Sequence, residues 1–466
     1  MNAYLTLLKP ELLLVAMIFI LLLIKISKSY SESSLIHLIQ GLLAVNFGLG
    51  LFLNGEGQLF DHMYQTGPLV IAEKNILSLG MLLISLLFED WFKCCPYLAE
   101  FFILMLTALL GMFFMLSSGN LLLFYLALEM ATIPVAALAA FNFERKISSE
   151  AALKMILSSA FSSGVLLFGI SLVYGATGTI DFSELPSLMN SSNLQLLAFV
   201  FLFTAFAFKM SVVPFHLWTA DVYEGAPIAV TAFLSVISKG AIAFVFVAVL
   251  YRVFQPLHAV WYNMIMVLSV ATMVVGNLFA VRQTNLKRFL AFSSIAQVGF
   301  MLIGISSNSI NGEAALIYFV LVYIFSNLAA FGVVSLVSFY ANKEAIDDYK
   351  NFYKTNPLLS WVMALALFSL AGIPPTAGFF GKLFLLTAGA AKGNYVFIGI
   401  AALNMMISLY YYLKVVRAMF MDKNEDPIAP IPIALTTRIA LIACGAGIIA
   451  SGIYGGIFDY IQSLIK

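Results

Sequence analysis

Five lysines lie inside long apolar stretches of the sequence, where a charged side chain is rare. A lysine at the centre of a membrane helix costs about 2.5–3.5 kcal/mol on insertion scales, so its side chain must face a partner or a water path. The amine of a lysine can also take up and release a proton. The set therefore indicates proton transfer through a membrane, and it consists of Lys154, Lys209, Lys239, Lys382 and Lys414.

Glu129 lies in the middle of another apolar segment, LLLFYLALEMATIPVAALAAF, far from any loop. At that depth its carboxylate must be protonated or paired, and Lys209 is the partner that we expect. An opposite charge stabilises the ammonium of a lysine, whereas burial destabilises it. Separating the two groups would therefore let Lys209 release a proton. The alternative is a fixed structural ion pair.

Lys239 and Lys382 lie deep within their segments. Lys239, in FLSVISKGAIAFVF, has Ser235 and Ser238 close by in the sequence, and from that depth its side chain cannot easily reach either membrane interface. Lys382 follows Gly378 by four residues and is the corresponding lysine in the second half of the chain. We expect both lysines to relay protons through ordered water.

Three other candidates also have an ordinary explanation. Lys154 and Lys414 lie near the ends of their segments, where a lysine can extend to the interface, and Lys154 follows Glu150 at the i+4 spacing of a helix-surface ion pair. The tyrosines at 410–412 precede Lys414, and the ordinary alternative for them is an interfacial aromatic belt. His216, in PFHLW, either shuttles protons or holds the chain in place.

The apolar segments that hold these residues recur along the whole chain. Of its 466 residues, 62% are hydrophobic and only 10% are charged, whereas a soluble protein has about 25% charged residues. This composition excludes a soluble globular enzyme and predicts an all-α integral membrane protein of about fourteen transmembrane helices, each near the ~20 residues that cross a bilayer. The expected spans lie near residues 10–27, 35–53, 69–88, 97–117, 120–141, 150–175, 194–222, 228–251, 259–281, 288–307, 313–340, 357–391, 395–420 and 433–457.

Two of the expected spans are broken by proline. Pro214 interrupts FAFKMSVVPFHLWTADVYEGAP, and Pro374 and Pro375 interrupt LAGIPPTAGFFGKLFLL. Irregular backbone at membrane depth is tolerated where it is buried in protein or lines a cavity. The breaks lie five spans apart, each near a lysine, which is typical of inverted repeats. We expect four parts: an N-terminal three-helix segment at 1–96, a first antiporter-like repeat at 97–252, a second, inverted repeat at 257–420 and a C-terminal helix at 421–466.

Basic residues are distributed unevenly over the loops between the expected spans. Fourteen of them, including Lys25 and Lys28, fall on one side of the membrane, and five fall on the other. Because cytoplasmic loops retain Lys and Arg, this bias predicts that both termini lie outside. The five outer basic residues are Lys9, Lys74, Arg252, Lys392 and Lys466.

The net charge, the cysteines and the glycine motifs argue against a nucleic-acid partner and against a bound cofactor. The net charge is +1, which leaves no basic face for a nucleic acid. The cysteines at 94, 95 and 444 have no recognisable metal or cluster spacing, and the sequence has no phosphate-binding glycine loop or nucleotide fingerprint. We therefore expect no cofactor in this chain.

Six segments resemble one family of membrane proteins, subunit N of bacterial proton-pumping NADH:quinone oxidoreductases, the respiratory complex I. The resemblance is strong over residues 97–420, and the wording HLWTADVYEGAP differs from the corresponding sequence of the L and M subunits and of related cation/proton antiporters. The six segments are FKMSVVPFHLWTADVYEGAPIAVTAFLSVISK, ALEMATIPVAALAAF, SSEAALKMILSSAFSSGVLLFG, RFLAFSSIAQVGFMLIGI, IDDYKNFYKTNP and AGIPPTAGFFGKLFLL.

The resemblance implies a proton-translocating, antiporter-like subunit in the membrane arm of a complex in a bacterial cytoplasmic (inner) membrane. NADH, FMN, iron–sulfur clusters and quinone would belong to other parts of that complex. The implied partners are the lipid bilayer and other membrane subunits, including an M-type antiporter-like subunit and a small K-type subunit. Residue by residue, the motifs carry the family's functional positions to Glu129, Lys209, Lys239 and Lys382, and they also support Lys154.

One position departs from the family pattern, because many members have histidine where this chain has Gln297. Glutamine cannot titrate, although it can hold a water chain by hydrogen bonding. The path between Lys239 and Lys382 would then depend on water and on neutral polar groups. The candidates are Ser293, Ser294, Gln297, Tyr318 and Tyr323.

Two other functions share these features. A cation/proton antiporter subunit would need the same lysines and the same breaks, so these features do not separate it from a subunit of a redox complex. A scaffold whose buried charges only stabilise packing is a third possibility.

Overall fold

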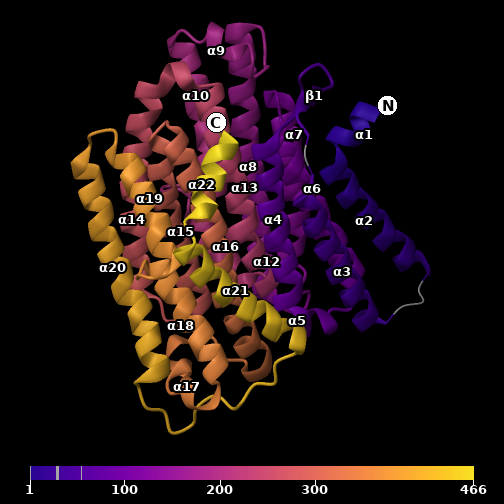
Figure 1. Cartoon of the computed structure of the whole chain (residues 1–466), viewed down its shortest axis with the longest axis vertical. Coiled ribbons are helices and arrows are strands. Elements are labelled where there is room, and N and C mark those ends of the chain that lie inside the picture. Colours follow the sequence, from indigo (N-terminus) through magenta and orange to yellow (C-terminus); the bar gives the residue numbers. More distant parts are fainter. Residues whose placement is uncertain (1, 28–30, 54, 466) are drawn as a thin grey trace.

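A computed structural model describes residues 2–27, 31–53 and 55–465. Lys28 and Lys466, which are both counted in the expected topology, lie outside this part of the chain. The described chain is a bundle of helices that run roughly along one common axis, and both of its ends lie near the same end of the bundle (Figure 1).

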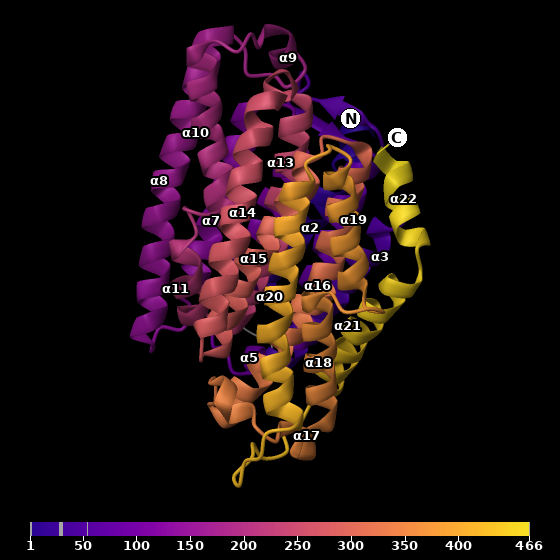
Figure 2. The same ribbon diagram turned by 90° about the vertical axis from the view of Figure 1, so that its left-hand side faces the viewer.

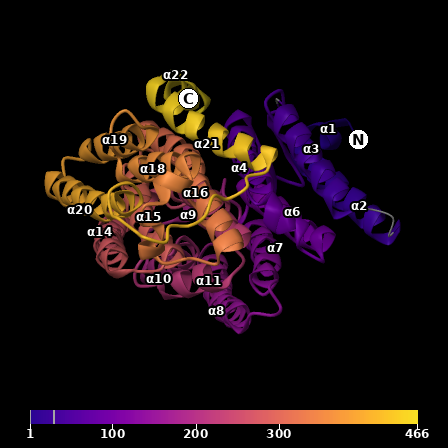
Figure 3. The same ribbon diagram turned by 90° about the horizontal axis from the view of Figure 1, so that it is seen from below.

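The first part of the chain forms one flank of the bundle (Figure 3). Its helices contact the rest mainly through α4 and through the packing of α2 on α6. A small antiparallel hairpin precedes α4, and neither this hairpin nor the short helices α1 and α5 were expected from the sequence. The elements are α1 (Asn2–Leu7), α2 (Lys9–Ser27), α3 (Glu32–Gly50), β1 (Gly57–Leu59), β2 (Tyr64–Thr66), α4 (Pro68–Leu87) and α5 (Glu89–Lys93).

The next helices include the first broken span. Asn120 caps the start of α7, because its side chain accepts a hydrogen bond from the backbone N–H of Leu123. Gly111 allows α6 and α7 to approach closely, since a Cβ there would lie 2.5 Å from the backbone nitrogen of Ala131. The helices are α6 (Leu98–Leu116), α7 (Leu121–Ala139), α8 (Lys146–Thr177), α9 (Leu185–Leu188), α10 (Asn193–Met210), α11 (Leu217–Gly225), α12 (Ile228–Phe233) and α13 (Lys239–Arg252), with a π-helical turn at Leu234–Ser238.

The last part of the chain contains the second broken span. Gly276 allows close packing of α14 on α15, because a Cβ there would lie 2.6 Å from the backbone nitrogen of Ala296. Small residues at such contacts are typical of membrane helices. The helices are α14 (His258–Arg282), α15 (Leu286–Ser306), α16 (Ile310–Ala341), α17 (Phe352–Thr355), α18 (Pro357–Ala371), α19 (Ala377–Ala390), α20 (Tyr395–Phe420), α21 (Leu435–Ile453) and α22 (Gly456–Ile465), with 3₁₀ turns at Gln255–Leu257 and Ile346–Tyr349.

The expected spans correspond to helices. In the described chain, thirteen helical stretches are long and apolar enough to cross a membrane, and the remaining expected span is the pair of shorter apolar helices α18 and α19. The prediction of an all-α, multi-span membrane protein is confirmed. The helix with the deepest burial is α15, followed by α16 and the continuous stretch Ile228–Arg252, so these three form the centre of the bundle.

Both predicted breaks are present. The first ends α10 at Ser211 (φ 65°), and the second ends α18 at Gly372 (φ 88°), so each helix stops at a left-handed residue. After each break the chain continues as a second helix, so that α10 lies above α11 and α19 lies above α18 in Figure 2. The two broken helices therefore run in opposite directions.

Candidate functional site

Lys209 lies at the end of α10, beside the first break, and hydroxyl groups surround its ammonium. Lys209 Nζ donates hydrogen bonds to Thr132 Oγ1 of α7 (2.9 Å) and to Ser159 Oγ of α8 (2.6 Å). Glu129 lies one turn before Thr132 and accepts a hydrogen bond from Ser163, which lies one turn after Ser159. The lysine and the glutamate thus occupy neighbouring levels of the same α7–α8 interface.

The expected direct pair between Glu129 and Lys209 is not formed within 4.0 Å in the described chain. The two charges still interact, but hydroxyl groups take the hydrogen-bonding positions of both. The physical reason is that Thr132, Ser159 and Ser163 lie within reach of the two charged ends and solvate them.

A small cavity lies beside Lys209. It has a volume of about 20 Å³ and is lined by Thr132, Ser159, Lys209, Trp218 and Ser238, among others. That volume holds about one water molecule. The cavity therefore extends from Lys209 to Ser238, the residue that directly precedes Lys239.

Lys239 is the first residue of α13, directly after the π-helical turn. Such turns are frequent at functional sites. Its side chain is 1% exposed; Nζ donates a hydrogen bond to Ser294 Oγ of α15 (2.6 Å) and lies over the ring of Tyr223, 5.4 Å from its centroid. Among the described residues, no carboxylate lies within ion-pair distance of Lys239.

Lys382 lies on α19, beside the second break, and is also 1% exposed. Its Nζ donates hydrogen bonds to the backbone carbonyls of Leu370 (2.6 Å) and Ala371 (3.3 Å). These are the last residues of α18, where a helix leaves carbonyls without intrahelical partners. The ring of Phe300 lies below the ammonium, with its centroid 4.8 Å from Nζ. The break in the helix thus supplies the acceptors that hold the lysine.

Gln297 connects α15 to the same carbonyl. Its Nε2 donates hydrogen bonds to Leu370 O (3.0 Å) and to Tyr412 Oη (3.1 Å). The hydroxyl of Tyr412 also shares a hydrogen bond with Ser293 (2.6 Å). The other end of the amide, Gln297 Oε1, is buried and has no hydrogen-bond partner in the described chain, so it can accept a hydrogen bond from a water molecule. A row of neutral polar groups therefore reaches Lys382 from α15.

Tyr412 is a member of this row that the sequence interpretation did not single out. Tyr410 is 64% exposed, as an aromatic belt requires, but Tyr411 and Tyr412 are buried. The spacing of the polar and aromatic residues Asn404, Ser408, Tyr411 and Tyr412 places them on one helix face, which was the available signal. The aromatic-belt alternative therefore does not apply to two of the three tyrosines.

The two other tyrosines named from the sequence have different surroundings. Tyr323 accepts a hydrogen bond from Asn327 Nδ2 (3.0 Å), which also donates to Ser235 (2.9 Å) near Lys239. Tyr318 donates a hydrogen bond to the carbonyl of Ser451 on α21 (2.6 Å). Tyr323 therefore lies beside the central lysine, whereas the hydroxyl of Tyr318 is bonded to a peripheral helix.

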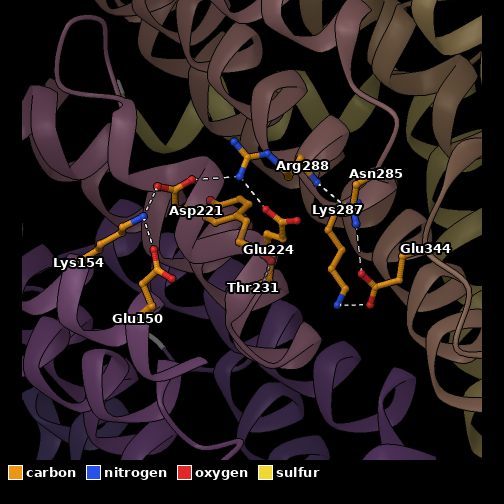
Figure 4. A network of polar contacts seen from close by, with 10 residues as sticks. Glu150, Lys154, Asp221, Glu224, Thr231, Asn285, Lys287, Arg288 and Glu344 are labelled. Carbon is orange, nitrogen blue, oxygen red and sulfur yellow. Dashed lines mark hydrogen bonds and ion pairs between the residues drawn. The ribbon is translucent and has the colours of Figure 1, made fainter. Parts of the chain in front are cut away.

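Lys154 belongs to a separate charged network (Figure 4). This network lies away from the end of the bundle that holds both termini. Its Nζ lies 2.7 Å from carboxylate oxygens of both Glu150 and Asp221. Arg288 of α15 bonds to the same Asp221 (3.0 Å) and to Glu224 (2.6 Å). Asp221 therefore connects α8 with α15 through two cations, and the Lys154 side chain is 43% exposed.

Lys414 and His216 lie apart from the three central lysines. Lys414 lies on the exposed surface of α20, near enough to Asp347 for their charges to interact. His216 directly precedes α11 and is buried, and its Nδ1 has no hydrogen-bond partner among the described residues. Neither residue contacts Lys209, Lys239 or Lys382 in the described chain.

Lys74 forms a buried ion pair. The prediction from the basic residues that Lys74 lies in an outer loop is therefore wrong. Lys74 lies in α4, and its Nζ contacts Glu11 Oε1 of α2 at 2.5 Å, with both side chains 2% exposed. Ser117 (2.6 Å) and Tyr64 (3.2 Å) accept further hydrogen bonds from the same ammonium. Lys74 is therefore a buried structural residue, because Glu11 compensates its charge.

Comparisons with known proteins agree on one family. The family model described as "NADH:quinone oxidoreductase/Mrp antiporter, TM" matches residues 118–408. A protein of Phocaeicola vulgatus named NADH-quinone oxidoreductase subunit N is 48% identical over 411 residues, which cover 87% of each chain. A protein of the same name from Moorella thermoacetica is 38% identical over 425 residues, which cover 89% of this chain and 87% of its own.

Solved structures share the fold. A chain of respiratory complex I from Thermus thermophilus with bound aureothin has a TM-score of 0.80 and 29% identity, and the match covers 96% of this chain and 97% of that one. A chain of the Mrp complex from Dietzia has a TM-score of 0.84 at 20% identity, covering 99% and 96%. At that identity, the likeness to the Mrp complex is one of fold.

Proposed function

Since the chain belongs to the subunit N family of NADH-quinone oxidoreductase, we propose that it moves protons across the membrane through Lys209, Lys239 and Lys382. In this family the chain is a membrane-arm subunit of complex I, an enzyme in which NADH reduces quinone. NADH, FMN, iron–sulfur clusters and quinone bind to other parts of the complex, and electron transfer there drives proton movement here.

The observation that carries this proposal is the contrast between two kinds of buried lysine. Lys74 has a carboxylate partner at 2.5 Å, as a structural charge in a low-dielectric interior requires. Lys239 and Lys382 are equally buried, but in the described chain only hydroxyls, backbone carbonyls and aromatic rings surround their ammonium groups. A proton held only by neutral dipoles can leave without breaking an ion pair.

The proposed path has three stages. A proton on Lys209 passes through the one-water cavity to the level of Ser238 and Lys239. From Lys239 it passes to Ser294 and, through water, along Ser293, Tyr412 and Gln297. The last acceptor is Lys382, which shares the carbonyl of Leu370 with Gln297.

Glu129 acts as the regulator of the first stage. Its charge interacts with that of Lys209, although hydroxyl groups separate them. A displacement of α7 against α8 that moves Glu129 away would destabilise the ammonium and favour release of the proton. We propose that the redox reaction elsewhere in the complex causes such a displacement.

The proposal includes an orientation and an internal symmetry. The opposite directions of the two broken helices (Figure 2) support two inverted five-helix repeats, at 97–252 and 257–420, with 1–96 and 421–466 as additions.

The excess of basic residues in the loops at the end away from the termini supports a cytoplasmic position for that end, so both termini would face the periplasm. The neighbouring subunits would be of the M type and the small K type.

The test is proton pumping by the whole complex reconstituted in liposomes. Lys382→Ala should assemble normally and move fewer protons for each NADH oxidised than the wild type. Lys392→Ala, which removes an exposed lysine, is the matched control and should leave that ratio unchanged. An unchanged ratio in Lys382→Ala would show that the second break does not carry the proton.

A further inference from the structure

A second set of charged residues lies at the end of the bundle where both termini lie, away from the network of Figure 4. Arg252 is the last residue of α13, the helix that begins with Lys239. It lines a surface cavity of about 540 Å³ together with residues of the β1–β2 hairpin and the end of α22. One helix, α13, thus runs from the central lysine to a residue that lines a large cavity at the surface.

An inner cavity lies directly beneath this surface cavity. Its volume is about 20 Å³, and Glu73 of α4, Glu313 of α16, Ser118 and Arg252 are among the residues that line it. This space holds about one water molecule, and the four polar side chains provide its hydrogen-bond partners. Leu69, Val70 and Arg252 line both cavities. A thin wall of side chains therefore separates the inner water position from the surface.

Glu73 is the unusual member of this set. It is 5% exposed, and it has no hydrogen bond or ion pair to another residue in the described chain, in contrast to the buried Glu11 with its lysine partner. Its charge interacts with those of Glu313 and Arg252. Arg252 interacts electrostatically with both carboxyl groups, without a direct ion pair in the described chain, so the three groups together are neutral when one carboxyl carries a proton.

The three charged residues form a series from the interior to the surface. Glu73 is buried, Glu313 is half-buried and Arg252 is exposed. A proton that reaches Glu73 would therefore meet groups of increasing solvent access. Because Glu73 and Glu313 line the one-water cavity and Arg252 lines both that cavity and the surface cavity, the site has the geometry of an outlet.

The packing of α4 on α13 places Glu73 close to the level of Lys239. A Cβ on Gly80 would lie 3.1 Å from Ile237, and one on Gly240 would lie 3.7 Å from Leu77, so the two helices run antiparallel. Glu73 precedes Leu77 in α4 by one turn, toward the surface cavity that the start of α4 lines, a distance of about 5.4 Å along the helix. It therefore lies roughly one turn beyond Gly240, the neighbour of Lys239.

We propose that Glu73 and Glu313 form a proton-release site that serves Lys239 as a second exit, beside the path to Lys382. The ammonium of Lys239 gives a proton through water to the carboxylate of Glu73, which leaves a neutral amine and a carboxylic acid. Glu73 then passes the proton through the cavity water to the Glu313 carboxylate, and Glu313, which is half-buried, releases it to solvent. Arg252 stabilises the carboxylates that remain. This inference rests on the proposed function of Lys239.

Apolar side chains separate Lys239 from Glu73. Leu77 and Val320 flank Gly240 at this level, so water must enter this part of the path transiently. This short apolar section would act as a gate, because it keeps the outer cavity disconnected from Lys239 until the helices move.

The experiment compares Glu73→Gln, Glu313→Gln and Glu184→Gln in the whole complex, reconstituted in liposomes. Glu184 is an exposed glutamate beside α9, near the same end of the bundle, and serves as the control. We expect Glu73→Gln and Glu313→Gln to pump fewer protons per NADH than the wild type, with normal assembly on native gels, and Glu184→Gln to match the wild type. Glu73→Asp keeps a carboxyl group and should pump more protons per NADH than Glu73→Gln.

The outcomes separate the two proposals. If Lys239→Ala pumps normally, the proposed function is wrong. If Lys239→Ala pumps fewer protons per NADH while both glutamine variants pump normally, only the proposal of the release site is wrong. Redox-induced infrared difference spectra give a second readout, because a carboxylic acid band should disappear in Glu73→Gln but not in Glu184→Gln. If the band is unchanged in Glu73→Gln, Glu73 does not carry the proton.

Discussion

Gln297 and Lys382 donate hydrogen bonds to one and the same oxygen, the backbone carbonyl of Leu370, at 3.0 and 2.6 Å. This carbonyl lies at the end of α18 and is available because the helix stops at Gly372. The break therefore positions the lysine and couples it to α15, the most deeply buried helix of the bundle. A neutral amide occupies this position and cannot titrate, so the coupling depends on hydrogen bonding.

Substitution of Gln297 tests this coupling. Gln297→Leu removes the hydrogen bonds to Leu370 and Tyr412 and should lower the number of protons pumped per NADH. Gln297→His restores a donor at this position and should retain pumping. Gln283→Leu, at the surface of α14's end, should have no effect. Normal pumping by Gln297→Leu would show that the amide is not part of the path.

Tyr412 offers a sharper test, because the exposed Tyr410 on the same helix provides a control of the same chemistry. Tyr412→Phe removes only the hydroxyl that Ser293 and Gln297 share, at a cost of about 1 kcal/mol in stability. We expect slower proton pumping with nearly normal assembly. Tyr410→Phe removes an exposed hydroxyl and should leave the pumping rate unchanged. Equal rates in the two variants would exclude Tyr412 from the proposed row.

The Glu11–Lys74 pair should behave as a structural pair. Lys74→Met leaves the buried Glu11 carboxylate uncompensated, which should destabilise the subunit by about 3–5 kcal/mol and reduce the yield of assembled complex. The double variant Glu11→Leu with Lys74→Met should recover most of the yield. Thermal denaturation of the purified complex measures this effect. Complex that does assemble should pump a normal number of protons per NADH, and a reduced number would mean that Lys74 also carries protons.

Glu344 gives a prediction about pH. Burial alone would raise the pKa of this loop carboxyl, but attraction to Lys287 and hydrogen bonds from Lys287, Ser338 and Asn285 outweigh burial and hold its pKa below the ordinary value of 4.5. A lowered pKa in the folded state stabilises the fold above the pKa of the unfolded chain, and this stabilisation is lost as the pH falls through the folded value. Glu344→Gln should therefore lower thermal stability at neutral pH.

The control for this prediction is the pH profile itself. Wild type and Glu344→Gln should converge in melting temperature as the pH falls through the lowered pKa of Glu344 in the folded state, because the wild-type carboxyl is then protonated as well. Parallel profiles at all pH values would contradict the assigned role of the Lys287–Glu344 pair (Figure 4).

The sequence was sufficient to find the central lysines because their signal is local. A lysine such as Lys239 within a long apolar run is costly whatever surrounds it, and proline marks the breaks without any knowledge of packing. The bundle of membrane helices follows from the same composition. These features could be predicted because each depends on a single segment.

Contacts between segments could not be predicted in the same way. The Glu11–Lys74 pair joins residues 63 positions apart, and the sequence offered no reason to prefer it over loop positions. The hydroxyls around Lys209 come from α7 and α8, so the direct pair with Glu129 that charge alone suggested is replaced by hydrogen bonds. Tyr412 required knowledge of which face of α20 is buried.

The most direct test of the central claim is the number of protons moved per NADH by reconstituted complex that carries Lys239→Ala. The residue is buried and has no carboxylate partner in the described chain, so its removal leaves no uncompensated charge, and the complex should assemble and oxidise NADH. The account predicts a lower proton-to-NADH ratio than in the wild type and in the surface variant Lys392→Ala. A ratio equal to that of the wild type, in fully assembled complex, would contradict it.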